Sequence, residues 1–245
     1  MMIWFVFGAF TLFAAPPTQI FFQNLNAGKK QTVLIYGTSL SHGGAWAGAA
    51  KEWFDSAYPG LVTFVNSSGP GQNSAWGVAN LKTRVLDHHP NLVFVEFSFN
   101  DAHEKFKMPV ETGAANLDQI VKGLRAQDTN TVIVLQIMNV GWDAPNGKKS
   151  FSNRLQLEEY NSNYRLYAKE NDLPLLDHFP HWLQLKKSHP EQFQTFLPDG
   201  THPNKEGSLA ITWPTVKEWL EKTQIAANDL NKVNVKPVQP ESPLK

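Results

Sequence analysis

Cysteine is absent from this chain of 245 residues, and its absence excludes several kinds of chemistry. Without a thiol the protein can form no disulfide, no thiolate metal site, no cysteine nucleophile and no lipid anchor on cysteine. An excess of charge of either sign is also lacking, since 22 Lys and Arg balance 22 Asp and Glu. No long basic stretch is present, and binding of phosphate backbones needs clustered cations. Nucleic acid is therefore not an expected partner.

The apolar run at residues 3–15 is too short to cross a bilayer as a helix, which needs about 20 residues. It has the length of the apolar region of a secretory signal, although Ala14-Ala15 before Pro16-Pro17 is a weak and atypical cleavage site. We expect residues 1–18 to be a signal peptide, the protein to be exported to the periplasm or the medium, and no stable membrane anchor to remain after processing. Met1-Met2 supplies no Lys or Arg, so a packed N-terminal strand or an error in the gene model are the alternatives.

Apolar residues make up 42% of the chain and aromatic residues 12%, enough for a sizeable core. The length suits one domain of roughly 200 residues with additional ends. From residue 226 onward the sequence is polar and contains proline. We therefore expect one domain over residues 19–225 and a flexible polar tail over residues 226–245.

Short apolar runs alternate with segments whose apolar residues recur at helical spacing. The runs predict strands over residues 32–36, 61–65, 92–97, 131–137 and 173–176. Helical spacing covers residues 46–57, 75–85, 117–124, 155–170 and 209–220, and Pro214 must kink the last helix or mark its start. This alternation predicts an α/β protein with a parallel sheet covered by helices on both faces. Ligands of such sheets bind beyond the carboxyl ends of the strands, so the residues after each strand are the candidates for chemistry.

Three loops that follow predicted strands, and one that precedes the last helix, carry reactive groups. They are Gly37-Thr38-Ser39-Leu40, residues 66–73, residues 98–101 and Asp199-Gly200-Thr201-His202-Pro203. Together they offer a hydroxyl, glycine amides, a carboxamide and a carboxylate–imidazole pair. These are the parts of an acyl-transfer site.

A serine hydroxyl needs a neighbouring base to take its proton, and His202 can do this for Ser39 because imidazole titrates near neutrality. Asp199 can fix the tautomer of His202 and stabilise the imidazolium. A separation of three residues lets these two side chains converge if the segment turns tightly, which Gly200 permits. The backbone N–H groups of Ser39 and Gly71 and the side-chain amide of Asn100 are candidate donors to an oxyanion.

These segments, in this order, resemble the four blocks that define the SGNH/GDSL hydrolases, over about residues 31–222. The resemblance implies a flavodoxin-like three-layer αβα sandwich with a five-stranded parallel sheet. It also implies Ser39 as nucleophile, His202 as base with Asp199 behind it, Gly71 and Asn100 in the oxyanion hole, and no metal or other cofactor. Two positions depart from the family pattern: Thr38 replaces an aspartate, and Ser98 replaces a glycine and is expected to narrow the site.

Each fragment taken alone also has a structural interpretation. Ser39 could be a helix N-cap, Asn100 a loop residue that satisfies backbone groups, and Asp199 with His202 a hydrogen-bonded turn or two ligands of a metal site. The nucleophile elbow of α/β-hydrolases is disfavoured, because Ser41 stands where that motif has glycine. The complete set, in order and in the right places, favours catalysis.

The substrate is predicted less directly. His42 follows the nucleophile by three residues and could touch substrate or only support the start of a helix. Trp142, after the fourth strand, could stack on a sugar ring or cover the core. We expect a serine esterase that removes small acyl groups, most simply acetyl, from a carbohydrate through an acyl-enzyme. A lipid or simple-ester esterase, an acyltransferase, and a non-catalytic carbohydrate-binding protein on the same fold are the alternatives.

Overall fold

A five-stranded, entirely parallel sheet forms the centre of the computed structural model, which describes residues 15–145 and 149–233. The strands lie in the order β2-β1-β3-β4-β5, and each neighbouring pair is parallel. Their bounds are β1 Gln31–Gly37, β2 Val62–Asn66, β3 Leu92–Glu96, β4 Val132–Ile137 and β5 Leu175–Asp177. The predicted five-stranded parallel sheet is confirmed.

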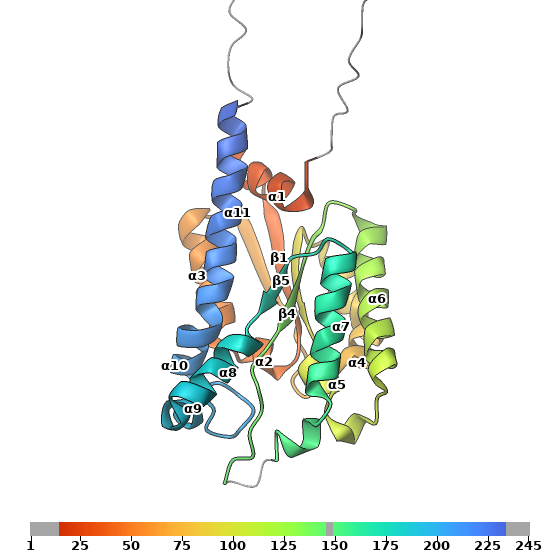
Figure 1. The fold of residues 1–245 in the computed structure, drawn as a ribbon. Helices are drawn as coiled ribbons and strands as arrows, with labels where there is room; N and C mark the ends of the chain where they lie inside the picture. The colour runs from red at the N-terminus through yellow and green to blue at the C-terminus, as the bar shows by residue number, and fades with distance from the viewer. Residues whose placement is uncertain (1–14, 146–148, 234–245) are drawn as a thin grey trace, which may run out of the picture.

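Helices cover both faces of this sheet (Figure 1). One face carries α1 Pro17–Asn26, α3 Ala45–Ala57 and α11 Trp213–Val233, and the other carries α4 Ser74–Arg84, α6 Val110–Gln127 and α7 Leu157–Glu170. The architecture is the flavodoxin-like three-layer αβα sandwich that the sequence predicted. Within the described ranges, no helix has both the length and the apolar character needed to cross a membrane.

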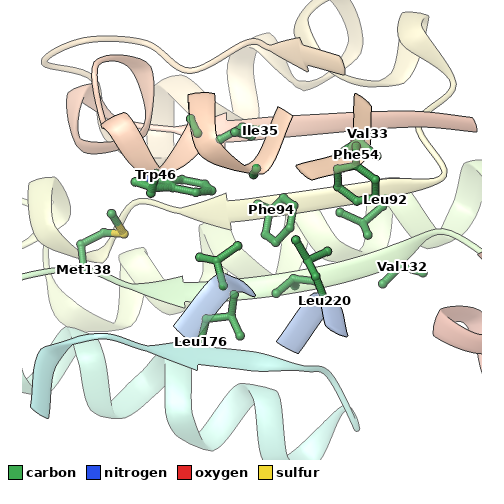
Figure 2. Packing of buried hydrophobic residues seen from close by; sticks show 14 of the residues in the cluster. Val33, Ile35, Trp46, Phe54, Leu92, Phe94, Val132, Met138, Leu176 and Leu220 are labelled. Atoms are coloured by element: carbon green, nitrogen blue, oxygen red, sulfur yellow. The ribbon is translucent and has the colours of Figure 1, made fainter. Parts of the chain in front are cut away.

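Alternate residues of the strands enter different layers of the core, because successive side chains of a strand point to opposite faces. Val33 and Ile35 pack toward α3 and α11, whereas Leu34 and Tyr36 pack toward α4 and α6. Figure 2 shows the first layer, where Phe94 of the sheet lies beside Trp46 of α3. Burial of both faces explains why these strands are recognisable as continuous apolar runs.

Short elements gather beyond the carboxyl ends of the strands (Figure 1). α2 Ser39–His42 directly follows β1, and α5 Ser98–Asp101 follows β3. β1 lies between β2 and β3, so the chain leaves it toward one side and later returns on the other. This is the topological switch point at which open α/β sheets bind ligands. The remaining elements are α8 Phe179–Ser188, α9 Pro190–Phe196, α10 Lys205–Gly207, the 3₁₀ turns η1 Leu86–His88, η2 Glu104–Phe106 and η3 Ser152–Arg154, and the π-helical turn η4 Ser208–Thr212.

The two predicted domain ends need correction. α11 continues past residue 225 to Val233, and Ala227 is buried at 1% exposure, so the predicted tail is wrong for residues 226–233. Asn26 of α1 also donates a hydrogen bond to Asn228 at 2.6 Å. α1 begins at Pro17, inside the predicted signal segment 1–18. Residues 1–14 and 234–245, which hold the rest of both predictions, lie outside the described residues.

Candidate active site

Ser39 is the first residue of α2 and is held at the carboxyl end of β1 by its neighbour Thr38. The Thr38 hydroxyl accepts a hydrogen bond from the Leu40 N–H at 3.2 Å and so caps the short helix. Both the N–H and the hydroxyl of Thr38 donate to the Glu96 carboxylate, at 2.6 and 3.0 Å. The backbone that presents the Ser39 hydroxyl is therefore fixed to the end of the adjacent strand β3.

His202 reaches Ser39 from the far end of the sequence. Its Nε2 lies 2.8 Å from the Ser39 Oγ, and its Nδ1 lies 2.8 Å from Asp199 Oδ2. The second oxygen, Asp199 Oδ1, accepts hydrogen bonds from the N–H groups of Thr201 and His202 at 2.9 and 2.7 Å. Gly200 adopts φ +77°, and a Cβ there would lie 2.1 Å from the Trp142 carbonyl oxygen. The tight turn expected between Asp199 and His202 is thus formed, and this position requires glycine.

The three predicted oxyanion donors lie on neighbouring loops. Gly71 adopts φ +72°, and its loop is tied to β1 by a hydrogen bond from the Gly69 N–H to the Gly37 carbonyl at 2.8 Å. The Asn100 amide donates one hydrogen to the Gln72 carbonyl at 2.7 Å. A carboxamide has two N–H donors, so the second remains available to a substrate oxygen. Asn100 therefore connects two of the predicted blocks.

A pocket of about 250 Å³ opens beside Ser39. Its lining consists of Ser39, Leu40, His42, Gly43, Gly44, Pro70, His202 and Pro203. His42 therefore lies at the site, as one of the two interpretations of this residue expected. A Cβ on Gly44 would lie 2.2 Å from the Leu40 carbonyl oxygen, so glycine is needed where α2 passes into α3.

Trp142 is not among the residues that line this pocket, and its indole is engaged elsewhere. Nε1 donates to the Leu197 carbonyl at 2.7 Å, and the ring packs near Phe193 with centroids 6.5 Å apart. The backbone N–H of Trp142 donates to the Gly200 carbonyl at 3.1 Å. The structure therefore places Trp142 as a brace for the Asp199–His202 turn and against the core, in line with the second of its two interpretations.

The Ser98 side chain, expected to narrow the site, bonds to a helix on one face of the sheet. Its buried hydroxyl donates to the Asn161 side chain of α7 at 2.9 Å. Ser98 is likewise absent from the lining of the Ser39 pocket. The substitution of glycine by serine at this position is accommodated by a hydrogen bond to α7 away from the pocket.

Two buried carboxylates near the site were missed by the sequence analysis. Burial raises the pKa of Glu96 to about 7, although hydrogen bonds from Thr38 oppose the shift. Burial likewise raises the pKa of Asp101 to about 7, opposed by hydrogen bonds from Ser74. Glu96 ends an otherwise apolar run, and an acid in such a position could have indicated a buried polar partner.

Among the described residues, the alternative of a metal site finds no third ligand beside Asp199 and His202. Across residues 15–145 and 149–233, no three His, Asp or Glu side chains gather closely enough to hold a metal ion. The two side chains instead bond directly to each other.

The GDSL-like lipase/acylhydrolase family matches the chain over residues 34–210. The chain belongs to this family. Among its relatives, thioesterase 1/protease 1/lysophospholipase L1 of Escherichia coli K12 is 29% identical over 199 residues, covering 80% of this chain and 84% of the relative. As a GDSL-like hydrolase of the SGNH fold, the protein is a carboxylic ester hydrolase.

Solved structures share the fold at lower identity. A two-domain esterase active on acetylated mannans has a TM-score of 0.67 and 19% identity, covering 94% of this chain and 57% of its own. A catalytic mutant of an acetylxylan esterase from Geobacillus stearothermophilus has a TM-score of 0.64 and 16% identity, covering 78% and 94%. At these identities the likeness concerns the fold.

Proposed function

We propose that the protein is a serine esterase in which Ser39, His202 and Asp199 form the catalytic triad. The observation that carries this proposal is the unbroken line of two contacts of 2.8 Å, from the Ser39 hydroxyl through the imidazole to the Asp199 carboxylate. A hydroxyl becomes a competent nucleophile when a base is within hydrogen-bonding reach and a third group orients that base. Both conditions are met here: His202 lies within reach of Ser39, and Asp199 orients His202.

In the first half of the reaction the Ser39 Oγ attacks the acyl carbonyl carbon and its proton passes to His202 Nε2. The carbonyl oxygen becomes an oxyanion, which the N–H groups of Ser39 and Gly71 and the Asn100 amide stabilise. The tetrahedral intermediate then collapses, the bond to the leaving alcohol breaks, and His202 returns the proton to that alcohol. Asp199 stabilises the imidazolium throughout.

In the second half a water molecule attacks the acyl group on Ser39. His202 takes one proton from this water, a second tetrahedral intermediate forms over the same donors, and its collapse releases the carboxylic acid. The proton held by His202 returns to the Ser39 oxygen. Because an alcohol could replace water in this half, product analysis with competing alcohols separates hydrolysis from acyl transfer.

For the substrate, we propose a small acyl group, most simply acetyl, on a carbohydrate. The pocket of about 250 Å³ beside Ser39 lies below the range of roughly 300–1,000 Å³ usual for sites that hold drug-sized ligands. Pro70 and Pro203 line it together with His42, so its walls include two rings with fixed backbone torsions. The solved relatives that act on acetylated mannans and on acetylxylan support the same substrate class.

A chain-length series of p-nitrophenyl esters tests the acyl group, and acetate release from acetylated xylan and mannan tests the carrier. We expect acetyl esters to give the highest kcat/KM and acetate to be released from at least one polysaccharide. Strong preference for octanoyl or longer chains would contradict the proposal.

A lipid or simple-ester esterase is the alternative, and two observations favour it. The relative from E. coli includes lysophospholipase in its name, and the same triad serves such a substrate. The exposed apolar side chains Phe151, Leu155 and Leu183 also line a second hollow, of about 130 Å³. If an acyl chain used this hollow, Leu155→Ala and Leu183→Ala would weaken binding of long esters only.

We also propose export, on the basis of the apolar run at residues 3–15. N-terminal sequencing of protein recovered from the periplasm or the medium tests this proposal. Retention of all protein in the cytoplasm with Met1 in place would contradict it.

A further inference from the structure

Arg154 is buried close to the proposed site, although it touches none of the reacting groups. It ends the 3₁₀ turn η3 and has 6% of its surface exposed. Within the described part of the chain, the guanidinium contacts carbonyl groups, a hydroxyl and an aromatic ring, and forms no ion pair. A buried cation is costly unless it is well hydrogen-bonded, so the position of Arg154 calls for an explanation.

One side of the guanidinium holds the loop that carries Asn100. Nε donates to the Phe99 carbonyl at 2.8 Å, and the guanidinium carbon lies 4.1 Å from the centre of the Phe99 ring. Phe99 immediately precedes Asn100, the proposed side-chain donor to the oxyanion. Arg154 thus holds the backbone of α5 in place through Phe99.

The other side of the guanidinium reaches the loop that carries Asp199 and His202. Nη1 donates to the carbonyl and the hydroxyl of Ser150, at 3.0 and 3.1 Å. The Ser150 hydroxyl in turn accepts a hydrogen bond from the Thr201 hydroxyl at 2.9 Å. Thr201 lies between Asp199 and His202 in the turn, and its N–H donates to Asp199 Oδ1.

We propose that Arg154 is a positioning residue that sets the placement of the Asn100 loop relative to the Asp199–His202 turn, through Phe99 on one side and Ser150 and Thr201 on the other. This inference rests on the proposed catalytic roles of Asn100, Asp199 and His202. The two loops lie far apart in sequence, and Arg154 is one side chain that connects both. Since misplacement by about 1 Å can cost a hundredfold in rate, loss of this connection should lower kcat.

The first variant is Arg154→Met, which keeps an unbranched apolar stem and removes the donors of the guanidinium. We expect kcat on p-nitrophenyl acetate to fall about 10- to 100-fold, with KM changed less than about threefold, because the misplaced groups act mainly on the transition state. The matched control is Arg125→Met. Arg125 also donates to a backbone carbonyl, that of Asn171, but at the opposite end of the sheet. The control should retain wild-type kcat.

Arg154→Lys and Thr201→Val separate positioning from mere loss of stability. Lysine keeps the charge but not the fork of donors, so Arg154→Lys should recover part of the lost kcat. Thr201→Val removes the hydroxyl that joins the turn to Ser150 while keeping the side-chain shape. If both residues act through one connection, the double variant Arg154→Met/Thr201→Val should be little slower than the slower single variant.

Three results would overturn the inference. They are a folded Arg154→Met protein with wild-type kcat, an equal loss in Arg125→Met, and fold-losses that multiply in the double variant. Should Arg154→Met fail to fold, Thr201→Val and Ser150→Ala remove the hydrogen bonds that continue the same connection. Wild-type kcat in both of these variants would also overturn the inference. Ser39→Ala distinguishes failure of the proposed triad from failure of the proposed role of Arg154. If Ser39→Ala retains activity, the proposed triad fails, whereas loss in Ser39→Ala with unaffected Arg154 variants refutes the role of Arg154 alone.

Discussion

Asp199 has two different tasks at the scale of single residues. Oδ2 bonds the His202 ring, while Oδ1 accepts the N–H groups that shape the turn. Asp199→Asn can keep the turn but offers an amide that favours the wrong imidazole tautomer. We expect kcat to fall by roughly 10²–10⁴ with little change in the melting temperature. Asp55→Asn, on the exposed surface of α3, should keep wild-type kcat, and an equal loss in both variants would contradict the role of Asp199.

Asn100 is expected to act mainly in the transition state, because the oxyanion forms only there. Asn100→Ala should therefore lower kcat by roughly 10²-fold or more and change KM less, as measured by steady-state kinetics. Asn80→Ala is the matched control, since the Asn80 amide also donates to a backbone carbonyl, that of Trp76, on helix α4. A change in KM alone in Asn100→Ala would show that the oxyanion assignment is wrong.

Glu96 makes stability depend on pH in a predictable direction. Burial raises its pKa from 4.5 to about 7, so the folded protein holds a proton that the unfolded chain releases between these values. The stabilisation of the folded state by protonated Glu96 is complete below pH 4.5 and is lost as the pH rises through 7. At about 1.4 kcal/mol per pH unit, the free energy of unfolding falls by up to roughly 3 kcal/mol from this group.

Glu96→Gln removes this titration and tests the assignment. The decrease in melting temperature between pH 5 and pH 8 should be smaller in Glu96→Gln than in the wild type. Part of the decrease should remain, because Asp101 is shifted in the same direction. Parallel pH profiles for both proteins would show that Glu96 does not titrate in this range.

At the scale of elements, the sequence predicted every strand but missed the short helices α5 and α10 and three longer ones. The strands were recognisable because burial on both faces makes them continuous apolar runs, as in Val33 to Tyr36. The missed helices α1, α8 and α9 share one feature: each has proline in its first turn. Proline is unfavourable inside a helix but favoured in its first turn, so these prolines mark helix starts that apolar spacing alone did not indicate. Pro214 differs, because it lies in a continuous helical stretch directly after the π-helical turn η4.

Helix α1 is part of the folded domain, and this can be tested with a matched pair of leucines. Leu25 of α1 is 1% exposed in the core cluster that includes α11, whereas Leu166 of α7 is 54% exposed. Leu25→Ala should lower the free energy of unfolding by about 2–5 kcal/mol, measured by urea denaturation. Leu166→Ala should change it by less than about 0.5 kcal/mol. Equal effects would contradict the packing of α1.

At the scale of the whole molecule, four loops distant in sequence meet at the carboxyl edge of one sheet. The predicted blocks around Ser39, Gly71, Asn100 and His202 could be placed there from sequence because strand ends of a parallel sheet share an edge. The interactions that hold the loops could not. Arg154, Ser150 and Trp142 act through hydrogen bonds to backbone and hydroxyl groups of other loops, and such pairings leave no periodic or spacing signal in the chain.

The central claim is that Ser39 is the nucleophile activated by His202, and covalent labelling by a fluorophosphonate followed by mass spectrometry tests it most directly. We expect one adduct on the peptide that contains Ser39, no adduct in Ser39→Ala, and greatly slowed labelling in His202→Ala. Protein that hydrolyses esters while Ser39 stays unlabelled, or that carries the adduct on another serine, would contradict the account.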